Sequence, residues 1–191
     1  MYRSGEKYDH VDKLAIDILI DYGISSFPLD MSELCRKMNI NLVPYSAYES
    51  GVELLMKKSI YGFSAHRTEN DNPTIYYNDV YGEHLSQANI SSTIGHEIRH
   101  ILDGDEDDSE DDLCNHFSRM LRCPAVLVIY HGITSQNELI SRFGISATQA
   151  TYVLGAVHNR IKKYGYAFFR YEIEYLQFLY GDEILDELQI I

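Results

Sequence analysis

The most constraining feature of the chain is the segment 94–101, which contains the pattern His-Glu-x-x-His inside a run of apolar residues. His96 and His100 are four residues apart, so on an α-helix they lie on one face, with Cβ atoms about 5–6 Å apart. The two imidazoles can therefore bind one metal ion, and Glu97 beside them can reach a water molecule on that metal. Zinc-dependent hydrolases use this arrangement of two imidazole ligands and a carboxylate base.

The apolar residues around the histidines predict that this helix, roughly Ser91 to Asp103, is largely buried; they are Ile94, Ile98, Ile101 and Leu102. Three polar residues can cap its start, and Gly104 can close its end; the candidate caps are Asn89, Ser91 and Ser92. Because buried imidazoles need partners, this context favours a metal site over a surface helix with two solvated histidines.

The composition indicates one domain, or one domain with a small appendage, and a net charge of −13. Residues 103–112 hold eight of the acidic side chains. This charge argues against a general phosphate-binding surface, so we expect no useful DNA binding. The chain has three cysteines without framework spacing, no signal-peptide pattern at its start and no apolar run of the length a membrane span needs. These features predict a reduced cytoplasmic protein.

Hydrophobic periodicity and turn residues predict an order of elements in which short strands precede a helical remainder. The expected helices before the metal helix cover residues 11–22, about 31–38 and 47–57, and the expected strands cover 40–45, 59–66 and 74–78. A capping box at Asp30 and a left-handed cap at Asn39 bound the second helix. After the metal helix, one helix is expected over about 109–122, and 134–160 has the pattern of a helix-turn-helix.

The third metal ligand is expected from the helix that follows the acidic segment. A catalytic zinc site usually has three protein ligands and one open position for water. A carboxylate in the first turn of this helix would face the metal helix if the two helices pack antiparallel. Asn115, one turn further along, could then hydrogen-bond a ligating histidine and orient it.

The paired motifs resemble the ImmA/IrrE-type metallopeptidases. That family has a His-Glu-x-x-His helix followed by Glu-x-x-Ala-Asn-x-Phe-Ala-x-x-Leu-Leu-Met-Pro, and residues 111–124 here read Asp-x-x-Cys-Asn-x-Phe-Ser-x-x-Leu-Arg-Cys-Pro. The resemblance extends to Phe-Pro-Leu-Asp at 27–30, Ile-Tyr-Tyr-Asn at 75–78 and Phe-Gly-Ile-Ser at 143–146, so it covers roughly residues 11–160.

The resemblance implies an α+β fold with a zincin-like core, which combines a small mixed sheet with the metal helix, and a helical, helix-turn-helix-like C-terminal part. We expect a peptidase domain over 1–125 and a helical subdomain over 126–191. His96, His100 and Asp111 would hold zinc, Glu97 would be the general base, and Asn115 would orient a ligand. The strand Ile75, Tyr76, Tyr77 and Asn78 would lie at the sheet edge and bind extended substrate by β-augmentation.

The chain departs from the family pattern at several positions. Asp111 stands where the family has Glu and is one methylene shorter, and Glu110 is the alternative ligand if the register shifts by one residue. Arg99 stands where Gly or Ser is common. Cys114 replaces an alanine that packs behind the site, so we expect a structural role for it.

The expected function is selective cleavage of a regulatory protein, by resemblance a phage- or stress-related repressor with its own helix-turn-helix. The alternative is a catalytically weak or inactive regulator that keeps the zincin fold and acts through protein or DNA contacts. Intact Glu97 favours the enzyme, whereas Asp111 and Arg99 favour the regulator. For the helix-turn-helix-like segment we expect support of the core or recognition of a protein, because the acidic remainder opposes DNA.

Overall fold

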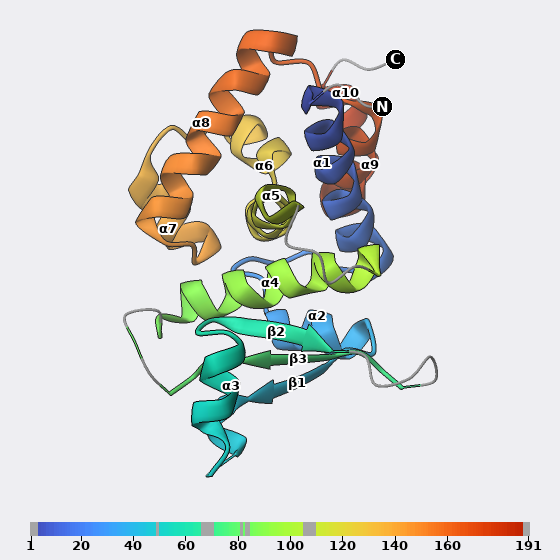
Figure 1. Cartoon of the computed structure of the whole chain (residues 1–191). Helices are drawn as coiled ribbons and strands as arrows, with labels where there is room; N and C mark the ends of the chain where they lie inside the picture. Colours follow the sequence, from blue (N-terminus) through green and yellow to red (C-terminus); the bar gives the residue numbers. More distant parts are fainter. Residues whose placement is uncertain are drawn as a thin grey trace. The chain divides into compact units, whose positions relative to one another are not determined.

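Figure 1 shows the chain as a computed structural model, which describes residues 4–48, 50–65, 71–80, 82, 85–104 and 110–188. The expected α+β class is confirmed: most of the described chain is helical, and a small mixed sheet lies in its first half. The chain divides into two compact units, Asp30–Ser118 and a second unit that joins Met1–Leu29 to Arg119–Ile191. These limits differ from the expected boundary near residue 125, because the first helix packs on a helix near the other end of the chain.

The unit Asp30–Ser118 holds the sheet and the helix that carries His96 and His100. Its elements are α2 (Met31–Lys37), β1 (Asn41–Pro44), the 3-10 helix η1 (Tyr45–Ala47), α3 (Val52–Lys58), β2 (Gly62–Ala65), β3 (Thr74–Tyr77), α4 (Gln87–Asp103) and the start of α5 (Asp111–Arg122). Asp30 is the N-cap of α2, as the predicted capping box requires of it: its side chain accepts hydrogen bonds from the backbone N–H of Ser32 and Glu33 at 2.9 and 3.1 Å. The left-handed cap at Asn39 is also present, with a φ of 56°. The helical stretch expected over 47–57 is instead η1 followed by α3.

The sheet has the order β1-β3-β2, with β3 parallel to β1 and antiparallel to β2. The expectation that residues 75–78 lie at a sheet edge is therefore wrong. β3 is the central strand, and its backbone groups pair with both neighbours, so it cannot add a further strand. Helix α4 packs on β2 and β3, as Figure 1 shows, and Ile75 is fully buried.

Helix α4 starts earlier than predicted, because Ser86 is its N-cap: the Ser86 hydroxyl accepts a hydrogen bond from the backbone N–H of Asn89 at 3.2 Å. The predicted end is confirmed, since Gly104 takes a left-handed conformation with φ 66°. Ile94 and Ile98 are buried as expected, but Leu102 is 41% exposed. The helix therefore buries a narrower face than its apolar residues predict.

The other unit is made of helices in its described part. They are α1 (Ser4–Asp21), α6 (Ala125–Tyr130), α7 (Gln136–Phe143), α8 (Ala147–Tyr164), α9 (Arg170–Tyr180) and α10 (Glu183–Glu187), together with the last residues of α5. Helix α1 packs on α9, and α7 packs on α8. Where the sequence predicts a helix-turn-helix, the structure has two helices, α7 and α8, joined by the short turn 144–146. Among the described residues, no helix has the length and apolarity needed to cross a membrane.

Candidate metal centre

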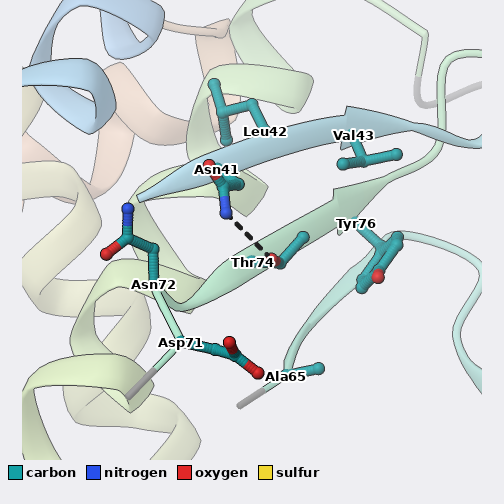
Figure 2. Close-up of a pocket in the computed structure, with 8 residues that line it drawn as sticks. All are labelled: Asn41, Leu42, Val43, Ala65, Asp71, Asn72, Thr74 and Tyr76. Atoms are coloured by element: carbon teal, nitrogen blue, oxygen red, sulfur yellow. Dashed lines mark hydrogen bonds between the residues drawn. The ribbon is translucent and has the colours of Figure 1, made fainter. Parts of the chain in front are cut away.

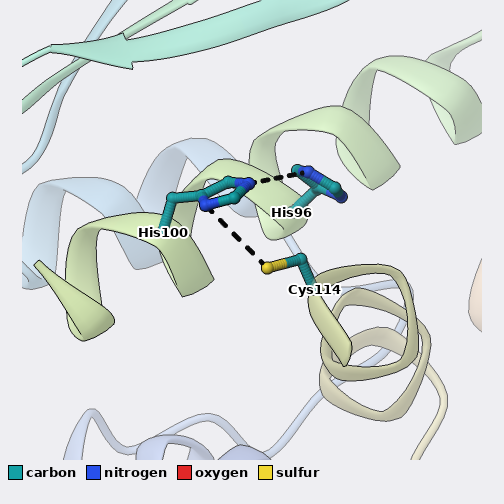
Figure 3. Close-up of side chains that lie close together, drawn as sticks. All are labelled: His96, His100 and Cys114. Atoms are coloured by element: carbon teal, nitrogen blue, oxygen red, sulfur yellow. Dashed lines mark hydrogen bonds between the residues drawn. The ribbon is translucent and has the colours of Figure 1, made fainter. Parts of the chain in front are cut away.

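His96 and His100 point toward each other from one face of α4, as Figure 3 shows. Their Nε2 atoms are 3.0 Å apart. The side chains are 18% and 10% exposed, so the pair is shielded but still open to solvent. The two nitrogens are the atoms with which metal-binding imidazoles usually coordinate.

Asp111 brings a carboxylate oxygen to both of these nitrogens. Its Oδ1 lies 3.6 Å from Nε2 of His96 and 3.8 Å from Nε2 of His100. Ligand atoms around a tetrahedral zinc, each about 2.0–2.1 Å from the metal, are about 3.3 Å apart. The three atoms therefore form a triangle of nearly the size that zinc requires, so the residues present fit this metal. Burial lowers the pKa of Arg99, whereas the charge of Glu110 helps to raise it.

Two adjacent residues of α5 face the other side of the imidazoles. Oδ1 of Asn115 is 3.2 Å from Nδ1 of His96, and Sγ of Cys114 is 4.0 Å from Nδ1 of His100. Because an amide oxygen only accepts, Nδ1 of His96 carries the proton, and its Nε2, which lies 3.0 Å from Nε2 of His100, is the acceptor nitrogen. Asn115 therefore has the orienting position expected for it.

Cys114 is closer to the site than the sequence indicated. His96, His100 and Cys114 form a group whose potential ligand atoms all lie within 4.8 Å of one another. This group could hold a metal, which makes Cys114 a second candidate for the third ligand. Asp111 fits better, because its oxygen faces the two Nε2 atoms, whereas the sulfur faces Nδ1. Burial also raises the pKa of the Cys114 thiol to about 11, although the charge of Arg99 opposes this. The signal that could have indicated Cys114 is its position beside Asn115.

A close approach between α4 and α5 brings these residues together. A Cβ atom at Gly95 would lie 2.6 Å from Oγ of Ser118 and 3.3 Å from its Cα, so only glycine fits here. The Ser118 hydroxyl donates to the carbonyl oxygen of Ser92 at 2.8 Å. Asp111, Asn115 and Ser118 share one face of α5, because they are spaced by four and three residues. The contact at Gly95 therefore determines how close the α5 side chains come to the histidines.

Glu97 is buried, with 8% of its surface exposed, and follows His96 directly. Burial raises the pKa of Tyr45 to about 12, and the charge of Glu97 adds to this effect. The hydroxyl of Tyr45 donates to the carbonyl oxygen of Ser59 at 2.9 Å. Tyr45 is fully buried and so has a structural role.

Arg99 is buried on α4 and pairs with Asp103 one turn later. Its Nε has no hydrogen-bond partner within the described residues. Burial lowers the pKa of Arg99, while the neighbouring Cys114 and Glu110 raise it. This residue therefore places a positive charge beside the cysteine that faces His100.

The four residues of the predicted substrate strand have different positions. Ile75 is in the core, and Asn78 stabilises a loop by donating to the carbonyl oxygen of Ile60 at 2.8 Å. Tyr77 is half-buried. Tyr76 lines a pocket of about 690 Å³, shown in Figure 2, whose other lining residues are Asn41, Leu42, Val43, Ala65, Asp71, Asn72 and Thr74. None of these belongs to the metal cluster, and strand alternation directs Thr74 and Tyr76 to the face opposite Ile75.

Comparison with models of protein families, with curated proteins and with solved structures found no match. The geometry around His96 and His100 is therefore the main support for a function.

Proposed function

We propose that this protein is a zinc-dependent metallopeptidase that cleaves a regulatory protein. The single observation that carries the proposal is the convergence of three potential ligand atoms, from His96, His100 and Asp111. Glu97, which follows His96 in sequence, is buried. The substrate class, a repressor with a helix-turn-helix, comes from the resemblance to the ImmA/IrrE family, as does the zincin-like core. The proposed setting is the cytoplasm, where the buried free cysteines would stay reduced.

The chemistry follows from the roles of the side chains. Zinc, when bound, would polarise the attacking water and the substrate carbonyl. Glu97 takes a proton from the water and delivers it to the leaving amine. Asn115 holds Nδ1–H of His96, and thereby keeps Nε2 of that imidazole directed at the ligand triangle.

The substrate strand is assigned to β2 in place of β3, because β2 is an edge strand that packs against α4. The backbone N–H of Asn78 donates to the carbonyl oxygen of Tyr61. Antiparallel alternation therefore directs the backbone N–H and C=O of Phe63 toward β3, and those of Ser64 away from β3. An extended peptide could then pair with the backbone of Ser64.

The proposal is tested by incubating helix-turn-helix repressors from the same genome with purified wild type and with Glu97→Gln, and by following their cleavage. The amide keeps the shape of the carboxylate but cannot act as a base, so cleavage should fall by at least about 100-fold while zinc content stays unchanged. Mass spectrometry of the products identifies the cleaved bond. A Glu97→Gln variant that cleaves at the wild-type rate would remove Glu97 from the mechanism.

The second candidate is a regulator with little or no catalysis. The short Asp111 side chain and the buried cation of Arg99 favour it, because both depart from the family pattern near the site. It predicts that wild type holds zinc and binds the repressor without producing fragments.

A further inference from the structure

The positive charge of this acidic protein is concentrated in one segment. Residues 119–171 contain seven Lys or Arg and one acid, Glu138, although the whole chain has a net charge of −13. Arg122 is buried, and three others pair with acids outside the segment: Arg160 with Glu172, Lys163 with Asp9 and Arg170 with Glu174. The remaining three cations are Arg119, Arg142 and Lys162. The expectation of no DNA binding rested on that net charge. Charges further away than about 8 Å are largely screened at physiological salt, so the local distribution decides what a surface binds.

This segment contains the helix-turn-helix, whose turn is held tightly. Gly144 has a φ of 62° at the end of α7, and Ser146 and Gln149 form a reciprocal capping box at the start of α8. The guanidinium of Arg122 is buried and donates to the carbonyl oxygen of Gly144 and to Oε1 of Gln149, each at 3.1 Å. A buried cation is costly unless its hydrogen bonds are made. Arg122 therefore stabilises the geometry between α7 and α8.

The exposed face of α8 has no carboxylate, because the whole helix contains none. The side chains on this face can donate to or accept from base edges and phosphates; they are Thr148, Thr151, Tyr152, His158, Asn159 and Lys162. Arg119 lies over the ring of Tyr152, 4.9 Å from its centroid, and adds a cation beside this face. Arg142 on α7 is also exposed.

We propose that α7 and α8 bind duplex DNA, with the exposed face of α8 in the major groove. The occupant is inferred from charge complementarity and from the fixed helix-turn-helix geometry, which places a second helix in the groove. This activity is separate from the proposed peptidase chemistry, because α7 and α8 belong to one compact unit and His96, His100 and Asp111 to the other.

The test is fluorescence anisotropy of the full-length protein with labelled duplex DNA of randomised sequence, at several salt concentrations. Three cations, Arg119, Arg142 and Lys162, can reach phosphates, so affinity should fall by about 40-fold between 50 and 200 mM salt. Repeated selection from the pool should enrich a preferred sequence, and Asn159→Ala should relax that preference at one position.

A charge-matched pair of variants separates α8 from general electrostatics. Lys162→Glu and Lys13→Glu change the net charge equally, but Lys13 is on α1. Lys162→Glu should weaken binding by roughly tenfold and lower the salt slope by about one, whereas Lys13→Glu should change it less than about twofold. Unchanged thermal unfolding shows that both variants fold.

Three results would overturn the proposal. The first is no binding at low salt, and the second is equal losses for the two variants. The third is an effect of Lys162→Glu on repressor binding alone, which would assign α8 to a protein partner. Failure of repressor cleavage would count against the peptidase proposal and leave this one standing.

Discussion

Each histidine of the candidate centre has its own neighbour on α5. Asn115 accepts a hydrogen bond from Nδ1 of His96, Cys114 lies near Nδ1 of His100, and Asp111 lies near both Nε2 atoms. An orienting partner fixes the tautomer and direction of a metal-binding imidazole, and loss of such a partner costs roughly 10- to 100-fold in metal affinity. The three side chains therefore have separable effects on metal binding.

Asp111→Ala should lower zinc affinity by more than about 100-fold, because it removes a side chain that would bind the metal directly. Loss of a residue that only orients a ligand already lowers metal affinity by about 10- to 100-fold. Glu110→Ala is the matched control and should change the affinity less than about threefold. Competition with a chromophoric chelator measures both. If the Glu110 variant is the one that loses metal, the register assigned to α5 is off by one residue.

Cobalt substitution distinguishes Asp111 from Cys114 as the third ligand. With Asp111 bound, the spectrum should lack an intense sulfur-to-cobalt charge-transfer band, and Cys114→Ala should leave it unchanged. A strong band that disappears in Cys114→Ala would assign the third position to the thiolate, as the grouping of His96, His100 and Cys114 permits.

At the scale of elements, the contact between α4 and α5 determines the geometry of the centre. Gly95→Ala should destabilise the protein by about 1–3 kcal/mol, because the new methyl group overpacks against Ser118. It should also weaken zinc binding by moving α5 outward. Gly155→Ala on α8 is the control, because nothing lies within 4 Å of its Cβ position. The higher helix propensity of alanine should therefore stabilise this variant by about 0.5–1 kcal/mol.

A double mutant tests whether the Gly95 effect acts through Ser118. Ser118→Ala removes the hydroxyl that lies 2.6 Å from the position of the added Cβ. The destabilisation of the double mutant in urea unfolding should therefore be smaller than the sum of the two single changes. Additive values would show that the clash involves some other contact.

At the scale of the whole molecule, metal binding should couple to folding. The protein should carry about one zinc per chain. Removal of the zinc by a chelator should lower the thermal stability of the protein. A ligand that binds only the folded state stabilises that state by about 4 kcal/mol when its free concentration is a thousand times Kd. Asp111→Ala should show a much smaller shift on chelation. Less than about a tenth of an equivalent after zinc is added back would exclude the metal site.

Local signals predicted much of this structure. The spacing of His96 and His100, and the caps at Asp30, Asn39 and Gly104, depend on residues within one or two helical turns, so they can be read from the chain. The start of α4 was missed although it is also local. Several residues there can cap a helix, and the extended backbone of Ser86, with φ −66° and ψ 142°, decides between them.

Features that depend on residues far apart in sequence could not be predicted from local patterns. Strand order is one case: hydrophobic pattern predicted β3 but did not show that β1 and β2 pair on its two sides. The surroundings of His100 are another, because the position of Cys114 follows from how closely α5 approaches Gly95. The spacing of His96 and His100 was enough to show that the two imidazoles share a helix face, since helix geometry is set by neighbouring residues. Which side chains complete their environment was set by packing between helices, and no local pattern encodes that distance.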